Sequence, residues 1–577
     1  MASVVIKDGL FFDGCGGEGV LANVGIEDGK VTRISTGPLV APLDAQVVDA
    51  RGCWVMPGFI DLHTHYDAEV EVLPELGESV RHGVTTVVMG SCSLSLTVGS
   101  PVNLADMFCR VEAIPRRVVL PMLQERKDWD GPRAYFQHLE KLPLGPNVAA
   151  FLGHSTIRAE AMGMERALHK GITPTHDELR RMESMLGEAL DEGYLGLSIM
   201  TLGWDKMDGE QFRSRPLPSV FARWSEYRHF LRMLRARDRI FQAVPDISLR
   251  VNIPLFMLAS MGLFRRKLRT TIITLADIRS DRIAVHVAGW LSRFFNALGA
   301  DFRWQAQPHL IDLYADGMDL VVFEEFGAGA AALHYEKHAD RAKLLDDPAY
   351  REQFKKQWYN RLRPRAFHRN LRHSEILACP DGSVVGKSFA QLGADQGRDP
   401  VDVFLDLVVK HGTALRWHSV VGNDREDVLH AIMNHPDILI GFSDSGAHLR
   451  NMAYYNYPLR MLQLVQQAIS DGNPFMTVGR AVQRLTQEIG QWLGIDAGTL
   501  MVGRRADVVV VDPARLNVDV HQIHEQEMEG FGLKRLVRRN DDAVKAVLIN
   551  GHVAFQGGAF HPRLGKERGF GQVLRAK

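Results

Sequence analysis

Apolar and polar residues alternate with two different rhythms along the chain. Residues 3–56 hold short apolar runs separated by the turn pairs Asp8-Gly9, Asp28-Gly29 and Arg51-Gly52, which predicts a small antiparallel sheet. The far end returns to this pattern, with short apolar runs around Asn550-Gly551. We therefore expect one small β-sandwich domain built from both termini, residues 1–56 and 498–577.

Between these ends, residues 57–497 repeat a longer unit of apolar strand, loop and amphipathic helix. Eight strands alternating with helices predict the α/β class and a (β/α)8 TIM barrel, whose catalytic groups lie at the carboxyl ends of the strands. The eight predicted strands are GFIDLHTH, GVTTVVMGSC, NVAAFLGHS, GYLGLSIMT, RIFQAVPD, TTIITLAD, DFRWQAQP and DILIGFSDSG.

One region interrupts the repeat. Residues 320–400 are dense in charged and aromatic residues, as in the run QFKKQWYNRLRPRAF. An insertion of this size before the last strand predicts a helical lid over the barrel mouth, with a plain solvated helical insertion as the alternative.

Composition narrows the class of protein. The chain has 577 residues, 46% of them hydrophobic, and 68 Lys+Arg against 69 Asp+Glu, which excludes a disordered chain and offers no overall field for nucleic acid. Five scattered cysteines favour reduced thiols over a disulfide framework. With no secretory signal pattern at its start, the chain is expected to be a cytoplasmic enzyme.

The longest apolar stretch lies within residues 250–269 and ends in Arg265, Arg266, Lys267 and Arg269. At about 14 residues it is too short to span a bilayer. Two interpretations stay open, a buried barrel helix with a solvated end and a helix on a membrane surface.

The sharpest local motif is Asp61-Leu62-His63-Thr64-His65 at the end of the first predicted barrel strand. Because side chains alternate along a strand, His63 and His65 point to the same face and can reach one metal ion. The alternative is that both are ordinary polar residues satisfied by hydrogen bonds.

A second motif, Gly441-Phe442-Ser443-Asp444-Ser445-Gly446-Ala447-His448, follows the last predicted strand. A carboxylate at this position can bind a metal opposite the histidines and accept a proton from water, so we predict Asp444 as both ligand and general base. Its alternative role is to cap the following helix. His448 and Asn451, just downstream, are predicted substrate contacts.

Taken together, PGFIDLHTHYD, GVTTVVMGSC, FLGHSTIR, FSDSGAHL and LMVGRRADVVVVDP resemble the amidohydrolase superfamily, and within it the N-acyl-D-amino-acid deacylases, or D-aminoacylases. The resemblance implies that Cys92, at the end of the second strand, is a metal ligand in place of a carboxylated lysine, although inert packing is its alternative. It also places His154 near the pocket to polarise the substrate carbonyl and Arg158 to hold its carboxylate; a structural role for His154 is the alternative.

The sequence departs from the two-metal pattern of this superfamily, in which strands five and six each end in a histidine. Gln242 stands in the fifth strand, where it is a predicted substrate contact, and the sixth offers only Asp277. We therefore expect zinc bound by His63, His65, Asp444 and Cys92, one ion per chain, with two ions as the alternative.

The resemblance implies hydrolysis of the linear amide bond of an N-acyl amino acid, with the D configuration expected. The alternatives are a cyclic amidase of the hydantoinase or dihydropyrimidinase kind and a barrel scaffold without activity. The expected partner is a small-molecule substrate; we expect no nucleic acid and no stable membrane span, and the superfamily implies a homo-oligomer.

Overall fold

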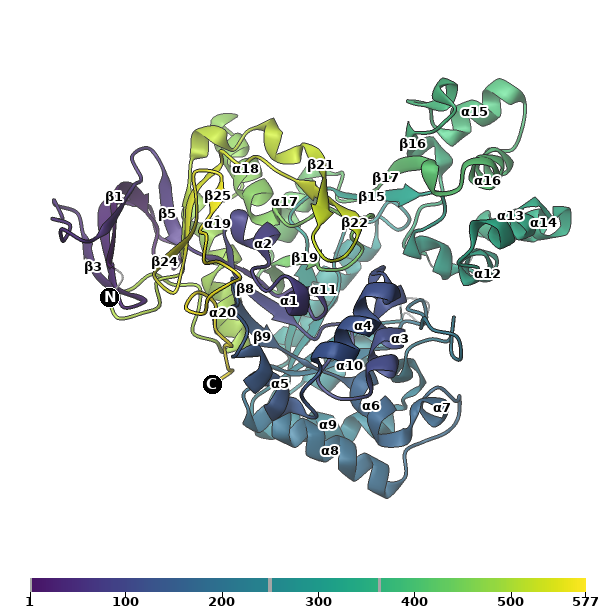
Figure 1. Ribbon diagram of the computed structural model, residues 1–577, viewed down its shortest axis with the longest axis horizontal. Coiled ribbons are helices and arrows are strands. Elements are labelled where there is room, and N and C mark those ends of the chain that lie inside the picture. The colour runs from purple at the N-terminus through teal and green to yellow at the C-terminus, as the bar shows by residue number, and fades with distance from the viewer. Residues whose placement is uncertain (1–2, 247–251, 362–364) are drawn as a thin grey trace.

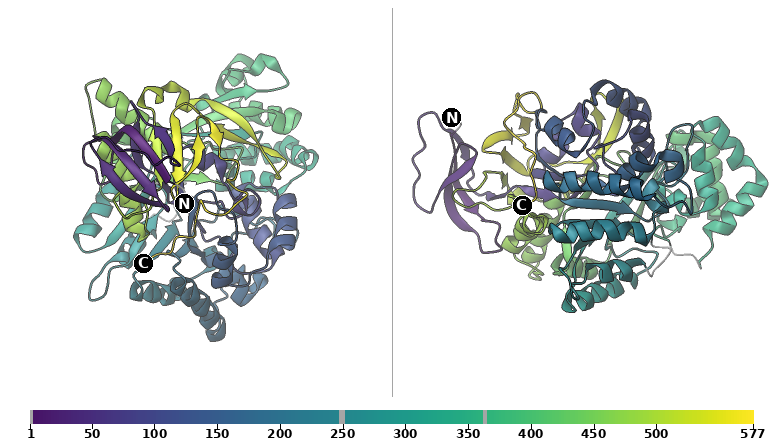
Figure 2. Two further views of the ribbon diagram at one scale, coloured as in Figure 1. Left: turned by 60° about the vertical axis from the view of Figure 1, so that its left-hand side comes forward. Right: turned by 90° about the horizontal axis from the view of Figure 1, so that it is seen from below.

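The computed structural model describes residues 3–246, 252–361 and 365–577. The strands of the chain termini lie at one end of the molecule and the segment with helices α12 to α16 lies at the other, with the remaining helices and strands between them (Figures 1 and 2). Among the described helices, none is long and apolar enough to cross a membrane.

The central strands form a circuit of parallel pairs. Three of the eight predicted strands are each divided into two short pieces, so the circuit runs β6–β8–β9, β10–β11–β12–β13–β14–β18 and β19–β7. The strands are β6 (Phe59–Asp61), β7 (His63–Thr64), β8 (Val84–Met89), β9 (Asn147–Ala150), β10 (Leu152–Gly153), β11 (Gly196–Met200), β12 (Ile240–Val244), β13 (Arg269–Ile272), β14 (Asp301–Ala306), β18 (Ile438–Ile440) and β19 (Phe442–Ser445).

Helices between these strands cover them with their apolar faces. Helix α8, for example, begins with a capping box in which Thr175 and Glu178 satisfy each other's backbone amides, and it buries Met182, Leu186 and Leu190. The helices are α1 (Glu69–Val72), α2 (Gly77–Arg81), α3 (Pro101–Glu112), α4 (Arg116–Arg126), α5 (Pro132–Leu139), α6 (His154–Met162), α7 (Met164–Ala167), α8 (His176–Asp191), α9 (Trp224–Ala236), α10 (Asn252–Ser260), α11 (Ala284–Ala297), α17 (Glu426–Asn434), α18 (Tyr457–Ser470), α19 (Val478–Leu485) and α20 (Gln487–Leu493).

Both ends of the chain contribute to one further sheet, as their common pattern predicts, but it is mixed rather than antiparallel, because the first strand of the chain runs parallel to residues 46–49 and 54–55. Strand β20 joins the two ends, because it pairs with β5 on one side and with β23 on the other. The sandwich prediction implies two sheets, whereas hydrogen bonds link all nine strands into one: β1 (Ser3–Phe11), β2 (Val20–Glu27), β3 (Lys30–Ser35), β4 (Gln46–Asp49), β5 (Trp54–Pro57), β20 (Val508–Val511), β23 (Val544–Ile549), β24 (His552–Gln556) and β25 (Ala559–Phe560).

The insertion is larger than the helical lid expected from residues 320–400, and it includes a sheet. Its antiparallel strands are β15 (Ile311–Asp316), β16 (Ser374–Ala378) and β17 (Arg416–Gly422), and its helices are α12 (Gly327–His334), α13 (His338–Asp346), α14 (Pro348–Trp358), α15 (Phe389–Gln396) and α16 (Pro400–His411). Phe323, Trp358, Phe404 and Trp417 belong to a hydrophobic core of its own. The segment therefore has the packing of a compact unit rather than of a loose lid.

A hairpin near the C-terminus, β21 (Ile523–Met528) and β22 (Leu533–Arg538), lies outside the terminal sheet. Its Leu536 amide donates to the carbonyl of Leu449, and Arg535 pairs with the buried Glu69 at 2.7 Å. Arg538 pairs with Asp312 at the start of the insertion. This hairpin thus ties the barrel loops to the insertion, whereas the sequence pattern assigned residues 498–577 as a whole to the terminal domain.

Candidate active site

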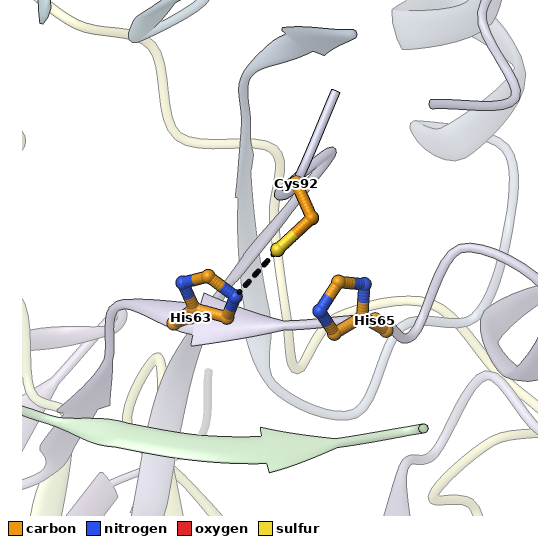
Figure 3. A group of neighbouring side chains, drawn as sticks. All are labelled: His63, His65 and Cys92. Atoms are coloured by element: carbon orange, nitrogen blue, oxygen red, sulfur yellow. Dashed lines mark hydrogen bonds between the residues drawn. The ribbon is translucent and has the colours of Figure 1, made fainter. Parts of the chain in front are cut away.

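The two histidines of the first strand stand on the same side of it, as their spacing predicts. His63 and His65 are both buried, and their rings face the loop that carries Cys92 (Figure 3). The His63 backbone pairs with Phe442 of the last strand, so residues from the two ends of the barrel circuit meet here.

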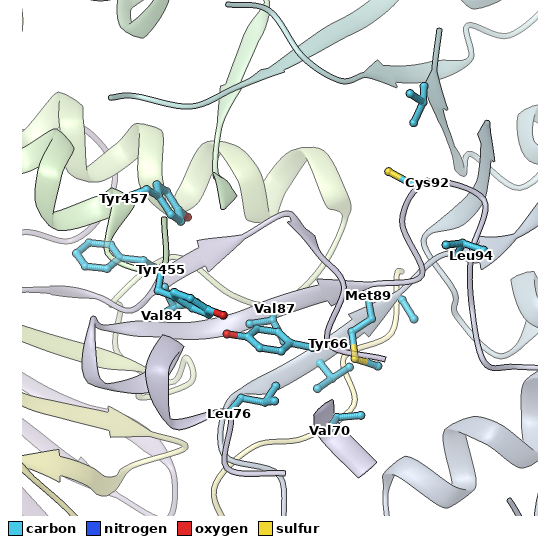
Figure 4. Close-up of a cluster of buried hydrophobic side chains, with 14 of the residues drawn as sticks. Tyr66, Val70, Leu76, Val84, Val87, Met89, Cys92, Leu94, Tyr455 and Tyr457 are labelled. Atoms are coloured by element: carbon cyan, nitrogen blue, oxygen red, sulfur yellow. The ribbon is translucent and has the colours of Figure 1, made fainter. Parts of the chain in front are cut away.

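Cys92 follows strand β8 on a strained turn. It has φ 55° and Ser93 has φ 70°, both in the left-handed region that side-chain-bearing residues seldom adopt. Gly90 makes the turn possible, because a Cβ there would lie 2.1 Å from the carbonyl oxygen of Phe151. The thiol is at the edge of the buried apolar cluster around Tyr66 and Met89 (Figure 4), and its sulfur lies 3.3 Å from Nε2 of His63.

Asp444 is the residue before the end of the last strand, and its carboxylate faces both histidines. Its Oδ1 lies 3.1 Å from Nε2 of His65 and 3.8 Å from Nε2 of His63. Its φ of 61° is also left-handed. Backbone strain is therefore present at two residues of one cluster, Cys92 and Asp444, and such strain is common at functional sites.

Two further residues hold the histidine rings from behind. Gln305 on β14 places its side-chain oxygen 2.7 Å from Nδ1 of His63, and Glu112 at the end of α3 places a carboxylate oxygen 2.9 Å from Nδ1 of His65. The Gln305 acceptor at Nδ1 fixes the proton of the His63 ring there and leaves its Nε2 facing the cluster, whereas Glu112 and His65 form an ion pair without hydrogen-bond geometry. Sequence reasoning missed both residues; Gln305 carried a usable signal, because it lies near the carboxyl end of a predicted strand.

Burial and neighbouring charge set the protonation of the cluster. Burial lowers the pKa of His63 to about 3 and raises the pKa of the Cys92 thiol to about 12. For His65, burial is outweighed by Glu112 and Asp444, which hold its pKa well above the usual value. The same histidine holds the pKa of Asp444 below its usual range against the effect of burial. The positive charge of protonated His65 thus balances the negative charges of Glu112 and Asp444.

Asp205 is another acid that sequence reasoning missed. It lies in the loop after β11, and burial together with Glu112 raises its pKa to about 7. The sequence around Asp205, GWDK followed by polar residues, contains no motif that would single out this acid.

His154 and Arg158 form a separate buried cluster with Glu226. The ring nitrogens of His154 lie 3.1 Å from Ser219 Oγ and 3.0 Å from Glu226 Oε1. Arg158 Nε donates to the same Glu226 oxygen at 3.0 Å, and its terminal nitrogens donate to backbone carbonyls. The contact of both residues with substrate stays a prediction, and the two hydrogen bonds of the His154 ring favour the structural alternative for that residue.

The remaining predicted substrate contacts differ in whether their side chains are already hydrogen-bonded within the protein. Gln242 accepts the Cys92 backbone amide at 3.2 Å, so it supports the cysteine loop. Asn451 donates to the carbonyls of Tyr314 and Asp319, which fixes the insertion to the last barrel loop. His448 lies 4.0 Å from Asp444 and keeps 14% of its side chain exposed. Asp277 is away from the cluster, paired with Arg282 and Arg425.

The donor atoms fit a metal ion. His63, His65 and Cys92 offer ligand atoms within 4.8 Å of one another, and this is the one such three-residue group in the described part of the chain. Two imidazole nitrogens, a thiol and a carboxylate are ligands that suit zinc. A divalent cation bound there would balance the negative charges of Asp444 and Glu112, as the proton on His65 does without a cation. The expectation of one ion per chain stays a prediction.

Comparison with known proteins gives the same family. Residues 46–211 match the model of the Amidohydrolase family. An uncharacterized protein of Mycobacterium tuberculosis is 45% identical over 579 residues, covering 99% of this chain and 94% of that one. N-acyl-D-glutamate deacylase of Alcaligenes xylosoxydans xylosoxydans is 35% identical, over 34% of this chain and 36% of that protein.

Solved structures share the fold over the whole length. The N-acyl-D-glutamate deacylase of Bordetella bronchiseptica, complexed with zinc and a phosphonate inhibitor, has a TM-score of 0.63 at 21% identity and 99% coverage of both chains. A D-aminoacylase structure has a TM-score of 0.62 at 18% identity, again over 99% of each chain. The chain thus matches the Amidohydrolase family over residues 46–211, resembles the N-acyl-D-amino-acid deacylases in sequence over about a third of its length, and shares their fold over its whole length.

Proposed function

We propose that this protein is a zinc-dependent hydrolase that cleaves the linear amide bond of an N-acyl amino acid, with the D configuration preferred. In this proposal residues 57–497, with their insertion, form a catalytic (β/α)8 barrel, and the nine strands of the terminal sheet form the accessory β domain. One observation carries it: donor atoms of His63, His65 and Cys92 lie within 4.8 Å of one another, and Asp444 Oδ1 lies 3.1 Å from Nε2 of His65 and 3.8 Å from Nε2 of His63.

His63, His65, Cys92 and Asp444 would hold the cation. When bound, a divalent cation supplies Lewis-acid polarisation of a carbonyl and makes a water-derived nucleophile available near neutral pH. Asp444 is the base of the site. It is left as a carboxylate because His65 lowers its pKa. It orients the attacking water, takes its proton and returns it to the leaving nitrogen, a contribution of about 10²–10⁴-fold in rate.

The cyclic amidase alternative has weaker support. A D-hydantoinase structure has a TM-score of 0.51 at 14% identity, which shows only a shared fold. The N-acyl-D-amino-acid deacylases, in contrast, also match in sequence over about a third of the chain.

The test combines metal content with a substrate panel. Protein purified without added metal is analysed for zinc per chain, and hydrolysis is measured on N-acyl-D- and N-acyl-L-amino acids and on a hydantoin. We expect about one zinc per chain and chelator-sensitive release of a D-amino acid. Hydrolysis of the hydantoin alone would replace the proposal with the cyclic amidase, and no zinc with no hydrolysis would favour the scaffold.

Two variants separate the roles of the ligands. Asp444→Asn should keep most of the zinc and lose about 10²–10⁴-fold in kcat. Cys92→Ser should lower the zinc content if the sulfur coordinates, whereas an unchanged content would assign Cys92 to packing.

A further inference from the structure

Helix α11 turns an apolar stripe to solvent. Ile283, Val287, Trp290, Phe294 and Leu298 recur at helical spacing and are 46–70% exposed. The opposite face of the helix, with Val285 and Ser292, is buried. A surface helix of a water-soluble protein normally presents polar residues outward, so this helix, apolar on both faces, lacks the cover that its outer face requires.

The neighbouring helix and the loop after it extend the apolar surface. Leu255 and Leu258 of α10 are 40% and 48% exposed. In the following loop Leu263 and Phe264 are 60% and 107% exposed. Phe264 has φ 57°, a backbone conformation that residues with bulky side chains seldom adopt. The amide of Gly262 donates to the carbonyl of Gly299, which places this loop tip beside the end of α11.

The exposed charged side chains of α10, the 261–268 loop and α11 are cationic, with the acids Asp281 and Asp301 flanking the ends of α11. Arg265, Arg266 and Lys267 follow Phe264 directly and are exposed, and Arg293 is exposed on α11. Residues 252–276 and 283–300 contain no Asp or Glu. We call the exposed apolar residues of α10, the 261–268 loop and α11, with these four cations, the basic apolar face.

We propose that the basic apolar face docks on an anionic phospholipid surface, with Phe264 and Trp290 inserted and the cations over the headgroups. Aromatic and aliphatic side chains beside Lys and Arg are the combination that holds peripheral proteins to such surfaces. A second copy of this chain fits less well. A two-fold interface would set the same basic face against itself, with no carboxylate in these segments to pair with the cations. The inference is independent of the proposed hydrolysis.

The test is flotation of the full-length protein with two kinds of vesicle, phosphatidylcholine alone and phosphatidylcholine with about one third phosphatidylglycerol. We expect binding to the anionic vesicles only, weakened by raised salt. Replacing the three loop cations together by glutamine should lower partitioning by about 5-fold per charge (about 1 kcal/mol each), or about 100-fold in all.

Apolar variants test insertion separately from charge. Phe264→Gly with Trp290→Ser should abolish flotation, whereas the matched control Leu43→Ser, at a residue 109% exposed outside the face, should not change it. Absence of binding to anionic vesicles would overturn the proposal. So would a dimer in sedimentation that Trp290→Ser dissociates, which would make this face a self-interface. Unchanged circular dichroism of each variant shows that it has folded.

Discussion

Two buried polar clusters near the ends of barrel strands contrast in how their atoms are satisfied. In the cluster of His154, Arg158 and Glu226, both ring nitrogens and the guanidinium have protein partners. In the cluster of His63, His65, Cys92 and Asp444, each histidine has one nitrogen held from behind and the other directed at a thiol or carboxylate. The first cluster is closed and the second is arranged for a cation, although both contain histidine in strand-end motifs.

The largest expected effect comes from removing both histidines of the cluster that contains Cys92 and Asp444. His63→Ala with His65→Ala should remove zinc and lower kcat/KM by at least about 10³-fold, because several kcal/mol of transition-state stabilisation depend on the cation. Elemental analysis and kinetics measure this. The double variant His169→Ala with His176→Ala, at two exposed histidines, is the control and should change neither quantity. Near-wild-type turnover in the first variant would end the metallohydrolase proposal.

Breaking the closed cluster should affect folding instead. Glu226→Gln leaves the fully buried Arg158 without its countercharge, so the free energy of unfolding should fall by about 3 kcal/mol. Urea unfolding measures the loss, and zinc content should stay unchanged. Asp177→Asn, which breaks the exposed pair with Arg180, should cost under about 1 kcal/mol. Loss of zinc in Glu226→Gln would show that the two clusters are coupled.

The smallest of these effects concerns the residue behind His63. Gln305→Leu removes the acceptor at Nδ1, so the proton on that ring is no longer fixed, and zinc affinity should fall about 10–100-fold. Competition with a zinc chelator measures the affinity. Gln305→Glu keeps an acceptor and should restore most of it; equal affinity in all three proteins would assign Gln305 to packing.

Much of the circuit of parallel strands was predictable because apolar strands alternate with amphipathic helices along residues 57–497. His63, His65, Cys92 and Asp444 could be predicted from the period of a strand and from the resemblance, and the structure brings them together. Glu112 and Gln305 could not be paired with them, because they lie about 50 and 240 residues further along the chain and only tertiary packing brings them behind the rings.

The sequence also could not show which polar residues are already satisfied. His154 begins α6 in the motif GHSTIR, and its partners Ser219 and Glu226 come from the segment after β11 and from α9. The insertion was underestimated for a related reason. Strands β15 and β17 lie next to barrel strands in sequence, and their short apolar runs cannot be told from barrel strands by period alone.

The pairing of β7 with β19 has a consequence for how the protein is made. His63 pairs with Phe442, which is synthesised about 380 residues later in the chain. At about 5–20 residues per second on the ribosome, the first strand remains an unpaired edge for roughly 20–75 s. Its seam with the last strand is where the ring closes, and the ligands from both sides of that seam come together only then. Of the four proposed ligands, Asp444 alone lies beyond that seam, so a chain interrupted before residue 442 would keep His63, His65 and Cys92 and lack the carboxylate.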